Sequence, residues 1–160
     1  MDTLFVMSFL EGSKSMSLDS QLHVSFLSRV LLPWYQAASF SLDIENVCKN
    51  TAPFVLGKGE LTMFGTSRNI PVVECVDNKS EAANFHRELL TTLDSREFVL
   101  EQPEFAGDNF LPHMSLYPGA YSQIPDQILI SDVVVASHHG GMGGAIEILG
   151  HYRLTGSSEQ

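Results

Sequence analysis

The chain has 160 residues and a mass of 17.6 kDa, and 44% of its residues are apolar while 18% are charged. This composition is typical of one globular domain and excludes a disordered, collagen-like or coiled-coil chain. Nineteen acidic residues against nine basic ones give a net charge of −10, so we expect no broad surface for long nucleic acid, although a pocket for a small anion needs only a few local donors.

The amino-terminal segment does not have the pattern of an export signal. Asp2 stands where a basic region would be expected, and Ser8 interrupts the apolar run over 4–10. Nowhere does the chain have the ~18 consecutive apolar residues that a membrane span needs. Two cysteines, Cys48 and Cys75, are too few for a disulfide or metal framework, which favours a reducing compartment. We therefore expect a cytoplasmic protein without membrane contact.

Two strands are predicted in the first thirty residues. The apolar run over 4–10 predicts a buried strand, and the polar stretch 13–20 predicts a loop. The segment 21–27 alternates between apolar and polar residues, as a half-buried strand does. One face of this second strand has Leu22, Val24 and Phe26, and the other has Gln21, His23 and Ser25.

The middle of the chain predicts two helices and two strands. Apolar residues recur at helical spacing over 34–49 after Pro33, which suits a first helical turn. Strands are expected over 54–63 and 70–76. Ser80 is a suitable N-cap for a second helix, whose apolar stripe extends to Leu93.

The last third predicts a second alternating strand and a closing hairpin. The strand covers 111–117, with Leu111, His113, Ser115 and Tyr117 on one side. The hairpin strands cover 128–137 and 145–154, around the glycine-rich loop 138–144. Strands outnumber helices and no linker interrupts the chain, so we expect one α+β domain over 1–154, followed by a polar tail at 155–160.

Two segments share a pattern that suits phosphoryl chemistry: His23-Val24-Ser25 and His113-Met114-Ser115. In a strand, residues two positions apart lie on the same face, about 6.5 Å from each other. If both strands face one cleft, one imidazole can take a proton from the nucleophile while the other protonates the leaving oxygen. The two hydroxyls can donate hydrogen bonds to the non-bridging phosphate oxygens. With six histidines in the chain, the bare pattern also arises by chance about once in six such sequences.

The segments Leu22-His-Val-Ser-Phe26 and Phe110-Leu-Pro-His-Met-Ser-Leu116 resemble the paired His-x-Ser/Thr motifs of the two-histidine (2H) phosphoesterase superfamily. This resemblance implies two pseudo-symmetric α+β lobes with antiparallel-rich sheets around a central groove, as in LigT-like proteins. It also implies that His23 and His113 are the acid–base pair. For hydrolysis of a cyclic phosphate we take His113 as the base that activates water and His23 as the acid, a choice between the two that the sequence itself does not determine. Ser25 and Ser115 would bind phosphate, and neither a metal nor another cofactor would be needed.

The resemblance predicts a metal-independent phosphodiesterase. Its expected substrates are small nucleotides with 2',3'-cyclic phosphates, 2'-5' linkages or cyclic oligonucleotide structure. Two alternatives remain at this point: a module that binds nucleotides in the same groove without turnover, or an unrelated α+β interaction domain with coincidental motifs. The oligomeric state is not predicted.

Further residues have both a functional and a structural interpretation. Tyr117 shares its predicted face with His113, so it could stack on a base or bind phosphate, or else be a half-buried rim residue. Arg29 and Arg153 could complement a phosphate, although solvated arginines are more common. Trp34 and Tyr35 could stack on a base, but aromatic residues that open a helix more often belong to a core or interface.

The remaining histidines predict no metal site. His138, His139 and His151 lie in or beside the closing hairpin without an accompanying carboxylate pattern. The nearby glycines at 140, 141, 143 and 144 are expected to form a turn, because no Lys-Ser/Thr ending of a phosphate-binding loop follows them. His86, at helical spacing before Leu89, is expected to be a packed or surface histidine.

Overall fold

The computed structural model describes residues 1–10, 22–65, 69–116, 118–138 and 146–157. Two α-helices and nine strands occur in these ranges. The helices are α1 (Ala37–Lys49) and α2 (Lys79–Thr91). The strands are β1 (Asp2–Phe9), β2 (His23–Leu32), β3 (Phe54–Phe64), β4 (Ile70–Val76), β5 (Val99–Leu100), β6 (His113–Ser115), β7 (Gln127–Ile130), β8 (Asp132–His138) and β9 (Ile146–Arg153).

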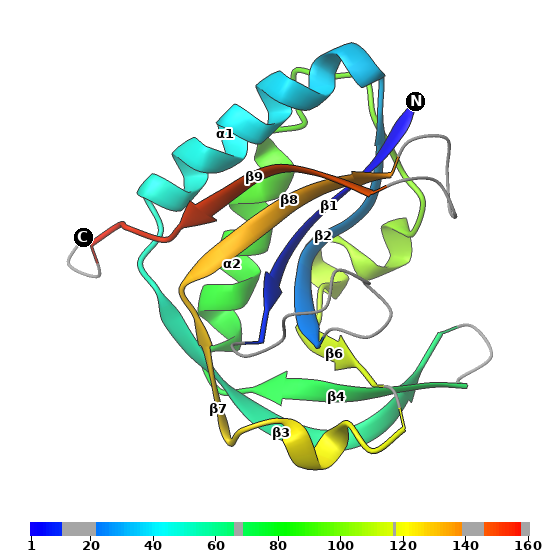
Figure 1. The fold of residues 1–160 in the computed structure, drawn as a ribbon, viewed down its shortest axis with the longest axis vertical. Coiled ribbons are helices and arrows are strands. Elements are labelled where there is room, and N and C mark those ends of the chain that lie inside the picture. The colour runs from blue at the N-terminus through cyan, green and yellow to red at the C-terminus, as the bar shows by residue number, and fades with distance from the viewer. Residues whose placement is uncertain (11–21, 66–68, 117, 139–145, 158–160) are drawn as a thin grey trace.

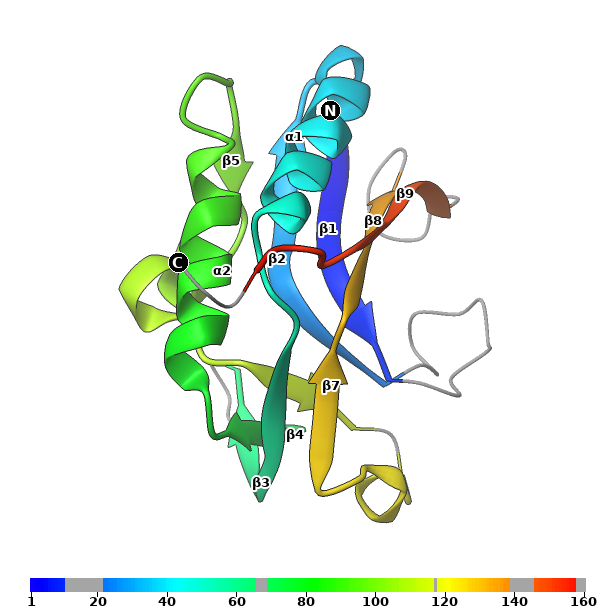
Figure 2. The same cartoon turned by 90° about the vertical axis from the view of Figure 1, so that its left-hand side faces the viewer.

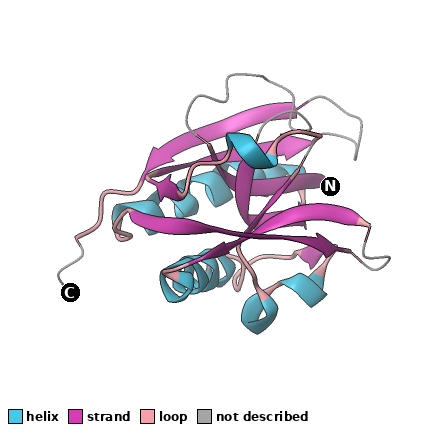
Figure 3. Ribbon diagram, turned by 90° about the horizontal axis from the view of Figure 1, so that it is seen from below, coloured by secondary structure: helices cyan, strands magenta, loops and turns pink. Residues whose placement is uncertain are grey.

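The strands form one curved sheet in the order β7-β3-β4-β6-β2-β1-β8-β9, with β5 paired to β2 (Figure 1). Every strand pair in the described ranges is antiparallel. The view from below shows the strands curling instead of lying flat (Figure 3). The predicted α+β class with antiparallel-rich sheets is therefore confirmed.

The hydrophobic core lies between the two helices and one face of the sheet. Helices α1 and α2 contact each other, and they pack on β9 and β2 respectively (Figure 2). Phe40 and Ile44 of α1 and Phe85 of α2 are at most 1% exposed, as are Val24 and Phe26 of β2. Because the helices cover this face, the polar residues that alternate with the apolar ones on β2 lie on the opposite face of the sheet.

Several predicted elements differ in extent from the observed ones. Strand β2 continues to Leu32, beyond the predicted end at 27. A short 3₁₀ turn, Trp34–Gln36, precedes α1, so the first helix begins three residues later than predicted. The prediction that Ser80 is the N-cap of α2 was wrong: the cap is Asn78, which has a left-handed backbone with φ of 51°. Asparagine tolerates this conformation better than most residues.

The last third of the chain differs more from the prediction. Strand β6 has only three residues, instead of the seven predicted over 111–117. Pro112 immediately precedes it and has no N–H for a ladder hydrogen bond. The predicted strand 128–137 is divided at Ser131 into β7, which pairs with β3, and β8, which pairs with β1 and β9. The pairing of β8 with β9 is the predicted hairpin. In the described ranges, no helix combines the length and apolar character needed to span a bilayer.

Candidate active site

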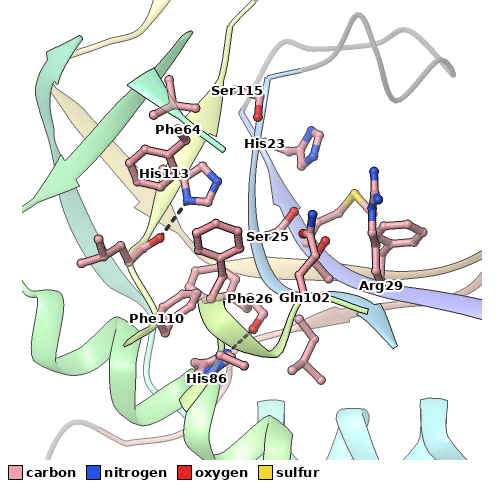
Figure 4. A pocket seen from close by; sticks show the side chains of 18 of the residues that line it. His23, Ser25, Phe26, Arg29, Phe64, His86, Gln102, Phe110, His113 and Ser115 are labelled. Atoms are coloured by element: carbon pink, nitrogen blue, oxygen red, sulfur yellow. Dashed lines mark hydrogen bonds between the residues drawn. The ribbon is translucent and has the colours of Figure 1, made fainter. Parts of the chain in front are cut away.

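The two His-x-Ser segments lie on neighbouring strands. Val24 of β2 pairs with Met114 of β6, and both side chains are fully buried in the core. The residues that flank each of them must then point to the opposite face, because side chains alternate along a strand. The structure thus brings His23, Ser25, His113 and Ser115 together on the face that the helices do not cover (Figure 4).

The register determines how these four residues are arranged. Continuing the antiparallel pairing from Val24 and Met114 places His23 opposite Ser115 and Ser25 opposite His113. The two histidines are then diagonal neighbours, about 7–8 Å apart at their backbones. This arrangement lets both rings and both hydroxyls face one ligand in the same cavity.

The four side chains line a cavity of about 620 Å³. This volume is within the usual range of small-molecule sites, which is about 300–1,000 Å³. Apolar side chains from several elements form much of the remaining wall, including Met7 of β1, Val72 of β4 and Phe110 before β6. The site therefore has a small polar group of residues in a largely apolar surround, as ligand sites commonly do.

His113 is held in a defined orientation. Its Nδ1 lies 2.8 Å from the backbone oxygen of Leu111, so in the neutral ring Nδ1–H donates to this carbonyl and Nε2 keeps its lone pair. Burial lowers the pKa of His113 below its ordinary value of 6.5. The hydrogen bond to Leu111 raises this pKa, the charge of His23 lowers it, and the carboxylate of Glu74 raises it. Because burial is the largest influence, His113 is neutral at neutral pH and is able to accept a proton.

An aromatic ring packs against each of the two histidines. The ring of Phe9 on β1 meets the His23 ring edge-on, with 5.6 Å between centroids. Phe64 at the end of β3 lies 4.6 Å from the His113 ring in a tilted arrangement. These contacts restrict the rotation of both imidazoles, so the two rings are oriented before a ligand binds.

His86 also lines the cavity, but its bonding is that of a structural residue. It is 3% exposed and stacks on Phe110 with a centroid distance of 4.1 Å. Its Nδ1 lies 2.5 Å from the oxygen of Phe26, and its Nε2 accepts a hydrogen bond from the N–H of Gly107. With one nitrogen donating and the other accepting, the ring is neutral, and burial lowers its pKa. The structure thus selects the packed alternative for His86.

The other candidate residues divide between the cavity and the outer surface. Arg29 lines the cavity, whereas Arg153 is exposed on β9 and is not among the lining residues. Trp34 and Tyr35 are 72% and 64% exposed and also lie away from the cavity. Tyr117 is outside the described residues.

No cluster of metal-ligating side chains occurs in the parts of the chain that the structure describes. His151 on β9 pairs with Asp132 on β8 and is exposed. His138 is 8% exposed, contacts the Phe5 ring and lines the cavity. His139 and the glycines of the 138–144 segment are outside the described ranges.

Several residues of the cavity were not found from the sequence. Phe64 and Phe105 supply aromatic walls, and Gln102 contributes an amide. Phe9 does not line the cavity itself but packs on the ring of His23. Phe9 is directly paired with His23 across β1 and β2. A strand register for β1 could have identified Phe9, but none of the other three residues belongs to a local pattern that indicates a ligand site.

Comparisons with known proteins show similarity in structure but not in sequence. No protein-family profile and no curated protein matches the chain. A phosphoesterase of known structure superposes with a TM-score of 0.65 and 13% identity, over 96% of this chain and 98% of the other. Escherichia coli LigT complexed with 3'-AMP gives a TM-score of 0.64 and 14% identity, over 96% and 98% of the two chains. The protein TT0787 of Thermus thermophilus gives 0.63 and 13%, over 97% and 99%.

These similarities extend over nearly the whole of each chain. The chain therefore has the LigT-like fold, as the resemblance of its two His-x-Ser segments predicted. Structures of E. coli LigT complexed with NADP+ and with ATP have the same fold.

Proposed function

We propose that this chain is a phosphodiesterase that hydrolyses small nucleotide phosphodiesters with His113 and His23 as its acid–base pair. The observation that carries the proposal is the arrangement of two imidazoles and two hydroxyls on adjacent strands, facing one cavity. The LigT-like fold supports it, because the resemblance to the 2H phosphoesterases extends from two short motifs to the fold of nearly the whole chain.

His113 is proposed as the general base. Its Nδ1–H is bound to the Leu111 carbonyl, so the lone pair on Nε2 is available to a water molecule in the cavity. The lowered pKa of His113 supports this role, since a base must be unprotonated at working pH. The water oxygen forms a bond to phosphorus as Nε2 takes its proton.

His23 is proposed as the general acid. As the new P–O bond forms, the bond from phosphorus to the leaving oxygen breaks, and His23 gives that oxygen a proton. The products are a phosphate monoester and a free hydroxyl group, so one water is consumed and one proton passes from His113 back to His23 through solvent. Ser25 and Ser115 donate hydrogen bonds to the non-bridging oxygens, whose charge increases in the transition state.

The size and lining of the cavity favour small nucleotides as substrates. A volume of about 620 Å³ with aromatic walls suits a base and a sugar phosphate. The net charge of −10 disfavours long nucleic acid. The structures of E. coli LigT with 3'-AMP, NADP+ and ATP support the same substrate class. Substrates with 2',3'-cyclic phosphates, 2'-5' linkages or cyclic oligonucleotide structure all fit this proposal.

The test is hydrolysis of a panel of these nucleotides by wild type, His23→Ala and His113→Ala, with product analysis by chromatography. Each variant should lose about 10²–10⁴ in kcat/KM, the usual contribution of a positioned proton donor or acceptor. Activity should persist in EDTA. His151→Ala is the matched control, because His151 is exposed and does not line the cavity. Full activity of either cavity variant would refute the proposal, and stabilisation by nucleotides without product would favour a binding module instead.

A further inference from the structure

The cavity extends beyond the two histidines to Arg29. Among the described lining residues, Arg29 is the only one with a permanent charge. All the other lining residues are apolar, histidine, serine, glycine or glutamine. A lone arginine in such a wall is notable in a chain with a net charge of −10, because most of its surface repels anions.

Arg29 lies in an irregular part of β2, on the same side of the strand as His23 and Ser25. The pairing of β2 with β1 shifts twice between Ser25 and Val30, which marks bulges in this part of the strand. Arg29 itself has a φ of 53°, a left-handed conformation that costs free energy in a residue with a Cβ. Its backbone oxygen accepts a hydrogen bond from the N–H of Glu101, which ties this conformation to the segment after β5. Bulges that redirect a side chain are frequent beside functional sites.

The guanidinium group of Arg29 is available to a ligand. In the described ranges it makes no hydrogen bond, and its ion pair with Glu101 has an N–O distance of 3.9 Å. Both side chains are about one-third exposed, at 35% and 33%. A guanidinium has five N–H donors, and a phosphate can accept two of them at once. At 3.9 Å the Glu101 carboxylate is too far from Arg29 for a hydrogen bond, so it leaves these donors to a ligand.

Gln102 supplies a neutral donor next to this arginine. The pairing of β5 with β2 places Val99 and Leu100 opposite Leu31 and Val30, and Gln102 follows two residues after β5. Its side chain lines the same cavity. In the view of Figure 4, the Gln102 amide lies between Ser25 and Arg29, and the Arg29 side chain extends in the direction of His23. Ser25 and Arg29 are four positions apart, a backbone span of at most about 13 Å.

We infer that Arg29 and Gln102 form a second phosphate subsite, which binds a phosphate of the substrate other than the one that reacts. The inference rests on the proposed function and narrows its substrate class to nucleotides with at least two phosphates. A cyclic phosphate that also has a 5'-phosphate and an oligonucleotide both meet this requirement. A lone 2',3'-cyclic nucleotide would leave the arginine without a partner.

The kinetic test compares adenosine 2',3'-cyclic phosphate with the same compound phosphorylated at its 5' position. Wild type should prefer the second substrate by about 10- to 150-fold in kcat/KM, the range expected for hydrogen bonds to a charged group. Arg29→Gln should reduce this ratio to near one, and Gln102→Ala should reduce it in part. Arg87→Gln is the matched control and should keep the ratio, because Arg87 is an exposed arginine of α2 paired with Asp108. A ratio near one in wild type, or an unchanged ratio in Arg29→Gln, would overturn the inference.

A binding test separates this inference from the proposed function. Thermal unfolding is followed with adenosine 3'-phosphate and with adenosine 3',5'-bisphosphate. The bisphosphate should raise the Tm of wild type and Arg87→Gln more than the monophosphate does, and Arg29→Gln should remove this difference. If no substrate is hydrolysed but the difference is present, the proposed function fails and the second subsite stands. If the difference is absent in wild type, the subsite fails whether or not hydrolysis occurs.

Discussion

The assignment of base and acid can be tested by changing the leaving group. A nucleoside hydroxyl needs a proton as it leaves, whereas a 4-nitrophenolate does not. The two substrates are 2'-5'-linked adenylyl-adenosine and adenosine 2'-(4-nitrophenyl phosphate), which share the phosphoryl group and differ in the leaving oxygen. His23→Ala should be severely impaired only on the first substrate, because the acid is dispensable when no proton is needed. His113→Ala should be impaired on both, since water must be activated in each reaction.

The expected losses are larger than any effect on folding. A positioned acid or base contributes about 10²–10⁴ in rate, or about 3–5 kcal/mol of activation free energy. Replacing His113 by alanine removes one hydrogen bond to the Leu111 carbonyl, which costs about 1 kcal/mol of stability. For a chain of this length such a loss lowers the Tm by about 2–4 °C. Val24 and Met114 remain buried behind the site, so the two strands stay paired.

The assay measures kcat/KM for both substrates with wild type, His23→Ala, His113→Ala and the control His151→Ala, at a temperature well below the lowest Tm. The reasoning is refuted if His23→Ala loses as much on the nitrophenyl ester as on the dinucleotide. If His113→Ala is the variant rescued by the nitrophenyl group, the two roles are reversed, and the orientation of His113 by Leu111 serves the acid instead.

Three further predictions concern charge, phosphate binding and stability. Glu74→Gln should move the acid limb of the pH profile of kcat/KM to lower pH, because the carboxylate raises the pKa of His113; an unmoved limb would contradict the assignment of His113 as base. Ser25→Ala and Ser115→Ala should each lower kcat/KM by about 10- to 150-fold without a comparable change in Tm, as expected for hydrogen bonds to charged oxygens. Burial lowers the pKa of His86 below 6.5, so the unfolded chain binds more protons and stability falls as pH drops below this value. His86→Gln should show a smaller fall in urea-unfolding free energy between about pH 7.5 and 5, and an equal fall would argue against this linkage.

The two His-x-Ser segments could be placed on one face from the sequence because their apolar neighbours determine the other face. Val24 and Met114 must be buried, so period-two alternation leaves each His and Ser pointing away from the core. The sequence could not show that β2 and β6 are direct neighbours, since 90 residues separate the two histidines and nothing local determines their pairing.

Arg29 was a candidate for phosphate binding from its charge, but its backbone conformation illustrates what a local pattern cannot predict. Alternation continued from Ser25 would place Arg29 on the same face, but the predicted strand ends at 27, and no glycine marks the left-handed backbone at position 29. The bulges depend on the pairing of β2 with β1 on one side and with β5 on the other. A conformation imposed by two non-local pairings leaves no signal in the residues that adopt it.

The shortness of β6 explains why the site depends on non-local packing. This strand has three residues, and only Met114 among them faces the core, where it is paired with Val24 on one side and Val73 on the other. Two further backbone hydrogen bonds attach the ends of β6 to β4. The N–H of Cys75 donates to the oxygen of Pro112, and the N–H of Leu116 donates to the oxygen of Pro71. The position of His113 is therefore determined mainly by the pairing of β6 with β4, whereas His23 lies on β2. The two proposed proton-transfer groups are thus contributed by separate parts of the sheet that meet through one buried methionine, and a phosphate bound between them would contact both parts at once.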